Sequence, residues 1–586
     1  MHPAPPLGQP PADSVARALA AGRDPLLDDF DEEDGITASV NNIQAVNITN
    51  PRSFTEAMRS EHSHQWQLAV DKEISSLVGK DTFVYVPEAE AKGKKLISSR
   101  WVFTTKPLSG SDSQLGSSSG VPVRFKARLV ARGDTQRAGI DFDEVYAPVV
   151  NSSTLRALLA MAAIDDLEVD HMDVVTAFLN APLEEELYLR IPDGFDARPG
   201  FVIRLKKSLY GLRQAPRCWN KTLHDWLLSY GLQQSQVDQS LYFIPNQLWV
   251  AVWVDDFIVA ARDANTKHAF KSALSQQFEM QDLGPIHHFL GMEIIRDRPN
   301  RTLTLTVTGH IDRILESFGM HKAHGTYTPM PSGTILEAYK EGDQVLPSQY
   351  PYRAVVGSLN YLVTWVRPDL AFAVTQLARH QERPMMRHWL AAKQCLRYLK
   401  TTRTVGLTYS ANPNIQLRDV AAAVGADLVL PTSLHGYVDA SWAEDLDTRR
   451  SQTGYVFCYG NSAISWNSHL QRLVTMSSTE AEYVALGEAV KEALYLRNLF
   501  SELLNAAPPS IPLFEDNQST IKQALNTQSS RRTKHIDIRH HFLKQHVANN
   551  VVSLHYIPTS LQSADCLTKC LDRVKVEFFR QIIIGS

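Results

Sequence analysis

Cysteine is scarce in this chain, and so are long apolar runs. Five cysteines are scattered over 586 residues, which argues against a disulfide framework and favours a reducing compartment. Cys566 and Cys570 are not followed by a second Cys/His pair at zinc spacing, so we expect no zinc site. The most apolar stretch, Trp249 to Ala261, is too short to cross a bilayer and contains two aspartates. We therefore expect no membrane association, and the Pro-rich N-terminus shows no secretory signal.

The chain also has almost no net charge for its length. The formal net charge is −4, which argues against a uniformly basic coat for nucleic acid. Six acidic residues lie in one N-terminal run, DDFDEED, and without them the net charge becomes +2. A near-neutral total can therefore conceal local basic tracts, which are what contact phosphates. Two tracts with interleaved aromatic residues stand out, at 204–217 and 393–403.

Composition divides the chain into a leader and three folded parts. Residues 1–50, Pro-rich and then acidic, predict a disordered leader. Helix-like and strand-like patterns alternate over 51–330, interrupted by a Gly/Ser loop at 108–120. Helical patterns dominate 331–430, and strand-like runs followed by a long helix pattern occupy 431–575. The predicted fold class is α+β.

Three aspartates interrupt apolar stretches of the 51–330 segment. Asp173 precedes Val-Val, and Asp255 and Asp256 divide LWVAVWVDDFIVAA into what we interpret as two strands joined by a turn. Asp-Asp at a surface turn needs no function, but apolar flanks on both sides place this turn at the edge of a core. Adjacent carboxylates resist burial unless a cation neutralises them. Three of them would suit Mg²⁺, and two such ions roughly 4 Å apart would suit phosphoryl transfer.

The C-terminal segment places further acids on separated elements. Asp439 lies on a predicted strand, Asp516 directly follows another, and Asp565 lies near the start of a last helix. Glu480 and Glu482 both open the long helix, where either could serve as a cap. Four acids from four segments suit a two-metal hydrolytic site. The order strand, helix, strand end, helix suits an RNase H fold.

The strings around these acids resemble the reverse transcriptase and RNase H of copia-type long-terminal-repeat retrotransposons. In the first region they are RFKARLVARG, HMDVVTAFLNAPLEEELYLRIPDGF, LKKSLYGLRQAPRCW, VWVDDFIVAA and DLGPIHHFLGMEI. In the second they are YVDASWAEDLDTRRSQTGYVF, SWNSHLQRLVTMSSTEAEYVAL, RRTKHIDIRHHFLK and YIPTSLQSADCLTK. The resemblance covers about residues 51–575. It implies a right-hand polymerase, with fingers and palm in 51–330 and a helical thumb or connection in 331–430, followed by an RNase H-like domain in 431–575.

The resemblance also implies roles for individual residues. The catalytic, metal-binding acids would be Asp173, Asp255 and Asp256 for polymerisation, and Asp439, Glu482, Asp516 and Asp565 for RNA hydrolysis. Glu480 would then be the helix cap. Each site would hold two Mg²⁺ ions, with Mn²⁺ as a substitute.

Four further residues match substrate-binding positions of the family. Lys126 and Arg128 would contact the incoming triphosphate, Gln214 would line the nucleotide pocket, and the Phe178 ring would occupy the space of a ribose 2′-hydroxyl. FLGMEI (289–294) resembles the primer grip. One departure is Trp253, which stands where the family has tyrosine, so the phenolic hydroxyl is lost while a ring that can stack on a base is kept. A second is Asn180-Ala181 in place of Asn-Gly.

The implied function is an RNA-directed DNA polymerase with a tethered RNase H. Its partners would be an RNA or DNA template-primer, an RNA–DNA hybrid and deoxynucleoside triphosphates. Its location would be intracellular, either cytoplasmic, for example in a virus-like particle, or nuclear. With no aspartic-protease or integrase motif in view, we expect a fragment of an element or a stand-alone reading frame. Two alternatives stay open: a relic that binds nucleic acid without polymerising, and a hybrid-specific nuclease whose polymerase half is a scaffold.

Overall fold

The computed structural model describes residues 49–107, 123–412, 414, 417–526 and 537–585. The predicted leader and Gly/Ser loop therefore lie almost entirely outside the described residues. None of the helices in these ranges combines the length and apolar composition of a bilayer-spanning segment.

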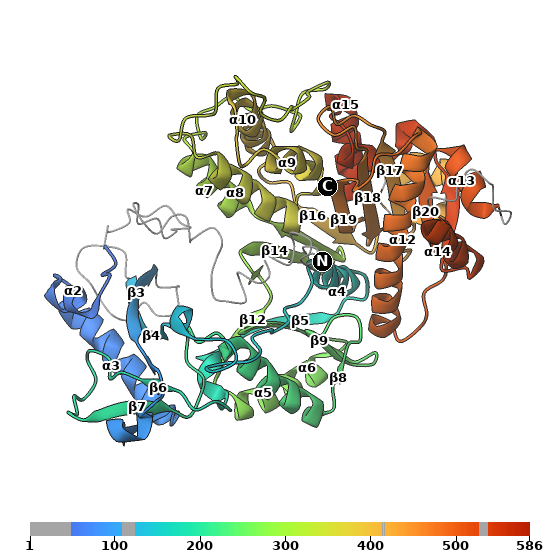
Figure 1. Cartoon of the computed structure of the whole chain (residues 1–586). Helices are drawn as coiled ribbons and strands as arrows, with labels where there is room; N and C mark the ends of the chain where they lie inside the picture. Colours follow the sequence, from blue (N-terminus) through green and yellow to red (C-terminus); the bar gives the residue numbers. More distant parts are fainter. Residues whose placement is uncertain (1–48, 108–122, 413, 415–416, 527–536, 586) are drawn as a thin grey trace, which may run out of the picture.

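The described residues of the N-terminal part form two α-helices and two small sheets, which lie at the lower left of Figure 1. Its elements are α2 (Phe54–Arg59), α3 (Ser63–Gly79), the β3–β4 pair (Ser99–Pro107 and Val123–Ala131), and a sheet of β1 (Phe83–Pro87), β7 (Phe201–Leu205), β6 (Tyr188–Leu189) and β2 (Leu96–Ile97). The single helix pattern over 54–77 is two helices in the structure. Ser60 ends the first, because its hydroxyl and its N–H both donate to the Ala57 carbonyl.

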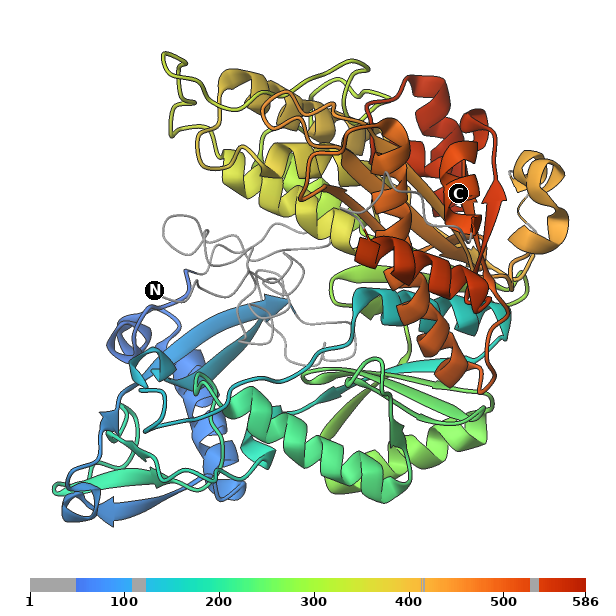
Figure 2. The ribbon, with the colours of Figure 1, turned by 45° about the vertical axis from the view of Figure 1, so that its right-hand side comes forward.

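A six-stranded sheet, here called the central sheet, follows in the fold. Its order is β12 (Met280–Pro285), β5 (Glu168–Val174), β11 (Asp256–Ala261), β10 (Leu248–Trp253), β9 (Leu241–Ile244) and β8 (Gln233–Gln234). Helices α5 (Ala215–Tyr230) and α6 (Ala264–Gln277) cover one face and α4 (Ser152–Ile164) lies on the other (Figure 2). Every residue of β10 is buried, since both faces are covered. This explains why the strand is continuously apolar rather than alternating.

The next part joins a four-stranded sheet to a group of helices. The strands are β13 (His288–Phe289), β14 (Met292–Asp297), β15 (Thr302–Thr306) and β16 (Leu407–Ser410), and the helices are α7 (Thr308–Ser317), α8 (Tyr352–Trp365), α9 (Ala371–Ala378) and α10 (Met386–Thr401). The segment 331–430 was predicted to be helical, but it also supplies β16. That strand is only four residues long, and it forms because β15 offers it a partner edge.

A mixed sheet, here called the C-terminal sheet, completes the fold. Its order is β19 (Ser462–Leu470), β18 (Gln452–Tyr459), β17 (His435–Ser441), β20 (Ile511–Glu515) and β21 (Val552–Tyr556), and the pairs β17–β20 and β20–β21 are parallel. The helices of this part are α12 (Ser478–Leu503), α13 (Gln518–Leu525), α14 (Asp537–Ala548) and α15 (Arg573–Ile584), preceded by α11 (Arg418–Val424). The α+β prediction is confirmed.

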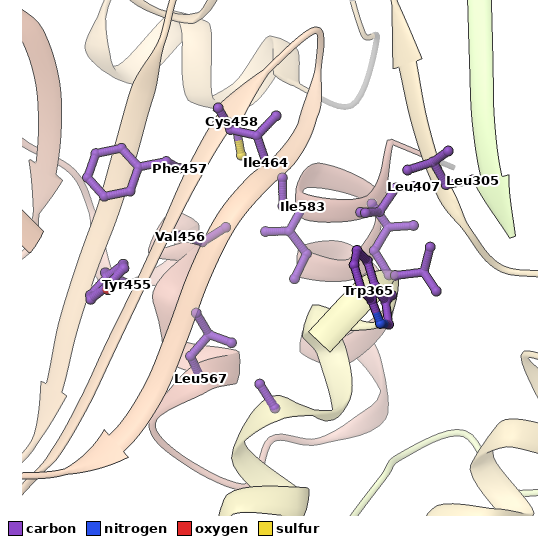
Figure 3. Packing of buried hydrophobic residues seen from close by; sticks show 14 of the residues in the cluster. Leu305, Trp365, Leu407, Tyr455, Val456, Phe457, Cys458, Ile464, Leu567 and Ile583 are labelled. Atoms are coloured by element: carbon purple, nitrogen blue, oxygen red, sulfur yellow. The ribbon is translucent and has the colours of Figure 1, made fainter. Parts of the chain in front are cut away.

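One hydrophobic core runs from the central sheet into the C-terminal sheet. Trp249 of the central sheet, Leu155 and residues 157–164 of α4, and Val456 and Ile464 of the C-terminal sheet are members of the same buried cluster. Figure 3 shows a part of it, where Trp365 and Leu407 lie near the side chains of the C-terminal sheet. The parts of the chain are therefore packed together rather than strung on exposed linkers.

Candidate active sites

The first group of acids lies where β5 meets the β10–β11 hairpin. Asp173 and Asp256 are direct partners in the antiparallel β5–β11 ladder. The turn of the hairpin is Val254–Asp255, with Val254 in the left-handed region at φ 55°. The Val174 N–H donates to the Asp255 carbonyl at 2.9 Å, which fixes this turn on β5. The two segments that carry these acids, about 80 positions apart in the chain, thus meet at one end of the central sheet.

Burial and mutual repulsion act on these carboxyl groups. Burial, followed by the charges of Asp255 and Asp256, raises the pKa of Asp173 to about 6. Burial and then Asp256 also raise the pKa of Asp255. His171 stands two residues before Asp173 on β5, and its Nε2 lies 2.9 Å from Asp256 Oδ1. Sequence reasoning missed this histidine, although its spacing of two along the strand would have predicted a shared face.

The cationic residues of β4 act on the same acids from the N-terminal part. Both Lys126 and Arg128 lower the pKa of Asp255 through their charge, against the larger effect of burial. The Arg128 guanidinium lies 4.9 Å from the ring centroid of Tyr210. Phe178 packs edge-on against that same ring, with centroids 5.0 Å apart. Tyr210, which the sequence analysis did not single out as a site residue, therefore joins the predicted triphosphate contact to the predicted ribose gate.

Gln214 occupies a different environment from the acids. Its side chain is fully buried at the start of α5, and Gln136 Nε2 donates to its Oε1 at 3.0 Å. Its own Nε2 donates to the Asp141 carbonyl at 3.1 Å. Both ends of this amide are bonded within the loop that precedes α4, so its role toward a nucleotide stays a prediction.

Trp253 is buried rather than presented to solvent. Its side chain is 8% exposed, and its ring meets that of Trp365 edge-on with centroids 5.6 Å apart. The tryptophan that replaces the family's tyrosine thus packs against the end of α8.

The second group of acids gathers at the parallel edge of the C-terminal sheet. Asp439 lies in β17, Glu482 lies in the first turns of α12, and Asp516 directly follows β20. Each offers an oxygen, and these three oxygens lie within 4.8 Å of one another. Within the ranges that the structure covers, this is the group of three acidic, His or Cys side chains that comes so close. Asp173, Asp255 and Asp256 are less tightly gathered.

Asp565 stands beside this trio rather than in it. It lies in the short 3₁₀ segment Ser563–Leu567, and its Oδ1 forms an ion pair with Lys569 Nζ, 2.9 Å away. Lys569 also lies 3.6 Å from Asp439 Oδ2, to which the Thr568 hydroxyl donates. Burial, and then Asp439, raise the pKa of Asp565 to about 7, against the opposing charge of Lys569. The ammonium group of Lys569 thus lies between the carboxyl groups of Asp565 and Asp439.

The trio has the chemistry of a divalent-cation site. Burial, followed by repulsion from Glu515 and Asp439, raises the pKa of Glu482 well above its usual value. Glu482 Oε2 is buried, and no hydrogen-bond partner is found for it among the described residues. Buried polar atoms are normally satisfied, and Mg²⁺ prefers carboxylate oxygens. The residues therefore fit the ion that the resemblance implies.

A fifth acid close enough to act on Glu482 was not identified in the sequence analysis. Glu515 is fully buried at the end of β20, its Oε1 accepts from the Asn517 N–H at 3.0 Å, and no partner for its Oε2 is found in the described part of the chain. The string FED, with two adjacent acids at a strand end, is the signal that could have predicted it. Burial, and then the charges of Asp439 and Asp516, raise its pKa.

The choice between the two glutamates of α12 is resolved locally. The Met476 N–H donates to Glu480 Oε2 at 2.7 Å, and the Ser477 hydroxyl accepts from the Glu480 N–H at 3.2 Å. These bonds satisfy N–H groups that a helix start leaves without partners. The prediction that Glu480 caps the helix is confirmed, and Glu482 lies beside Asp439 and Asp516, where its catalytic role stays a prediction.

Comparison with known proteins gives a consistent result over most of the chain. The family described as "Reverse transcriptase (RNA-dependent DNA polymerase)" matches residues 81–332. The retrovirus-related Pol polyprotein from transposon TNT 1-94 of Nicotiana tabacum is 36% identical over 546 residues, which cover 91% of this chain and 39% of the relative. A putative transposon Ty5-1 protein of Saccharomyces cerevisiae is 32% identical over 327 residues, which cover 55% of this chain and 100% of that protein.

One solved structure resembles a part of this chain, but too weakly to carry an argument. RNase H1 from the archaeon Halobacterium salinarum aligns over 23% of this chain and 94% of its own, with 17% identity and a TM-score of 0.18. The sequence relatives are decisive by themselves, even though this chain spans less than half the length of the tobacco polyprotein. The chain belongs to the Pol polyproteins of copia-type retrotransposons and carries their reverse transcriptase domain.

Proposed function

We propose that this chain is an RNA-directed DNA polymerase joined to an RNase H. The first activity would add deoxynucleotides to a primer on an RNA or DNA template, and the second would hydrolyse the RNA of the resulting hybrid. The central sheet would be the palm, the N-terminal part the fingers, residues 331–430 with the helices α8 to α10 the thumb or connection, and residues 431–575 the RNase H-like domain.

The observation that carries this proposal is the meeting of Asp173 with the Asp255–Asp256 turn, opposite the cations of β4. Three carboxylates at a buried hairpin oppose folding through repulsion, so a role in binding cations accounts for them. Arg128 and Lys126 would balance the charge of a triphosphate. Phe178, held by Tyr210, would stand where a ribose 2′-hydroxyl would otherwise fit.

Each site would use Mg²⁺, with Mn²⁺ as a substitute, in pairs. Such ions, when bound, supply positive charge for the attacking and leaving oxygens of phosphoryl transfer. The chain's own part is to hold the acids in place. His171 orients Asp256, the Asp255 carbonyl anchors the turn to β5, and Lys569 restrains Asp565 near Asp439.

The test is a reciprocal pair of substitutions in the full chain. Asp256→Asn should abolish primer extension on a poly-riboadenylate template and leave cleavage of a preformed RNA–DNA hybrid intact. Asp439→Asn should do the reverse. Loss of both activities in either variant, with folding unchanged, would contradict two separate sites.

A hybrid-specific nuclease with a scaffold polymerase half is the second candidate. It is favoured by the tighter gathering of Asp439, Glu482 and Asp516 relative to the first three acids. Hybrid cleavage by the wild-type chain, with no incorporation at any concentration of Mg²⁺ or Mn²⁺, would establish this candidate instead.

A further inference from the structure

Helix α4 is buried on all sides. Every residue from Ser153 to Ile164 is buried, although the helix belongs to the central sheet in sequence and in fold. Its other side meets the C-terminal sheet, where Ala160 and Ile164 approach the β18–β19 turn. A Cβ added at Gly460 in that turn would lie 3.6 Å from Ala160 and 3.5 Å from Ile164. A helix that is buried all round must have partners on both faces.

A charged residue lies inside this contact. Arg156 of α4 is 3% exposed, and its Nε donates to the Ile464 carbonyl of β19 at 2.7 Å. Its Nη1 donates to the carbonyls of Thr364 at 2.8 Å and Trp365 at 3.3 Å, at the end of α8. One guanidinium therefore bonds three parts of the fold: α4, the C-terminal sheet and the helical group.

These bonds match what the end of a helix needs. The last carbonyls of α8 have no partners within the helix and carry its negative partial charge, so a cation there is favourable. Trp466 of β19 satisfies another of them, since its Nε1 donates to the Val363 carbonyl at 3.0 Å. The Arg156 guanidinium stacks on the Trp466 ring, 3.9 Å from its centroid. An arginine suits this place because its planar fork can bond and stack at once.

The same helix end continues to the first group of acids. Trp365, whose carbonyl accepts from Arg156, packs edge-on against Trp253. Trp253 pairs with Asp256 across the hairpin turn that carries Asp255. Contacts therefore run without a break from β19, through Arg156 and α8, to the turn of the β10–β11 hairpin.

We propose that Arg156 is a positioning residue that holds the two acidic sites in one rigid body, so that RNA is cut at a fixed distance behind the primer end. This inference rests on the proposed function. Trp253 gains a role in it, because a tryptophan reaches Trp365 with a larger apolar ring than the family's tyrosine. Two outer contacts support the same joint: the hydroxyls of Thr154 and Tyr495 lie 2.7 Å apart, and the Gln236 N–H donates to Glu502 Oε1 at 2.9 Å.

Mapping of the cuts in the full chain tests the proposal. The substrate is an end-labelled RNA annealed to DNA primers whose 3′ ends are stepped along it. The wild type should cut within one or two nucleotides of a single distance, and the cuts should move step for step with the primer end. Arg156→Met should broaden this distribution at least threefold, while cleavage of a hybrid without a recessed end stays within threefold. Arg156→Lys should restore an intermediate width.

The chain offers a matched control arginine. Arg296 of β14 also bonds α4, at the Ala162 carbonyl at 3.2 Å, and it bonds Asp166 at 3.1 Å, and both acceptors lie outside the C-terminal sheet. Arg296→Met should therefore lower stability without changing the cut position. If Arg156→Met does not fold, Tyr495→Phe at the outer contact should give a smaller broadening. The proposal would be overturned if a folded Arg156 variant showed the same spread of cut positions as the wild type. It would also be overturned if the cuts made by the wild type did not move with the primer end.

A second readout needs no activity and separates this proposal from the function. Spin labels at exposed Leu228→Cys in α5 and Val574→Cys in α15, with Cys566 and Cys570 replaced by serine, report the distance between the two parts. The other three cysteines are buried and should not react. A narrow distribution that broadens with Arg156→Met supports rigid coupling even if neither activity is found. A broad distribution in the otherwise wild-type chain overturns it.

Discussion

Asp173 and Asp256 stand directly opposite each other on neighbouring antiparallel strands. Like charges in that relation destabilise the strand pair, and burial adds to the cost by raising the pKa of Asp173 to about 6. Asp170, another acid of β5, has a cation as its partner instead, because Lys267 Nζ lies 2.7 Å from its Oδ1. One strand therefore carries an acid paired with a cation and an acid opposed by another acid.

Asp256→Asn should raise the free energy of unfolding while it removes primer extension. Relief of one opposed pair is worth about 0.5–1 kcal/mol, measured by urea unfolding without divalent ions. Extension should fall about 100-fold or more. Asp170→Asn on β5 is the control with the opposite sign, since it should lower stability by breaking an ion pair. Equal destabilisation by both substitutions would show that Asp256 is a structural residue.

The two glutamates of α12 should separate stability from hydrolysis. Glu480→Ala removes a helix cap and should cost about 1 kcal/mol with hybrid cleavage retained. Glu482→Gln should reduce cleavage about 100-fold or more without a loss of stability, because it relieves repulsion within the trio. Thermal melting and a cleavage assay on the same preparations check both. Full cleavage by Glu482→Gln would remove it from the site.

Residues 431–586 expressed alone should fail to form a stable monomer. Their sheet packs on α4 through Ile464 and the turn at Gly460, and Tyr409, outside the segment, donates to the Ala463 carbonyl at 3.0 Å. Excision would expose this apolar face, which favours aggregation. Size-exclusion chromatography and binding of a hydrophobic dye measure the effect. A monodisperse, cooperatively melting segment would contradict a shared core.

Acid should destabilise the protein through buried histidines. Burial lowers the pKa of both His435 and His380 to about 4. Below the unfolded value near 6.5 the unfolded chain binds protons that the folded chain does not, so stability falls as the pH drops from 6.5 toward 4. Each histidine can contribute up to about 3 kcal/mol of this loss.

Urea unfolding at pH 7.5 and at pH 5 measures the loss, with His435→Leu as the comparison. The variant should show a smaller difference between the two pH values, because one buried proton acceptor is gone. Parallel behaviour of variant and wild type would exclude His435 as a source of the acid sensitivity.

The local elements and the acidic residues could be predicted from the amino-acid sequence. The continuous apolar run of β10 and the long helix α12 follow from periodicity. Spacing alone left the helix cap open between Glu480 and Glu482, and the family resemblance pointed to Glu480. The resemblance to the family identified the acidic residues of both sites. This was possible because the chemistry of phosphoryl transfer restricts which residue types can bind the metal ions. The end of α2 and the short strand β16 were harder to predict from the sequence. A single serine ends α2, and β16 forms only because β15 offers it an edge to pair with.

Which distant residues act on these acids could be seen only after the chain had folded. His171, Tyr210 and Glu515 acquire their places from neighbours far along the chain, and no local pattern specifies those neighbours. Arg156 would be interpreted from sequence as a polar residue on an apolar helix, yet it bonds β19 and the end of α8 at once. Packing brings together donors and acceptors hundreds of residues apart, and their distances exist only once the sheets have closed on both faces of α4.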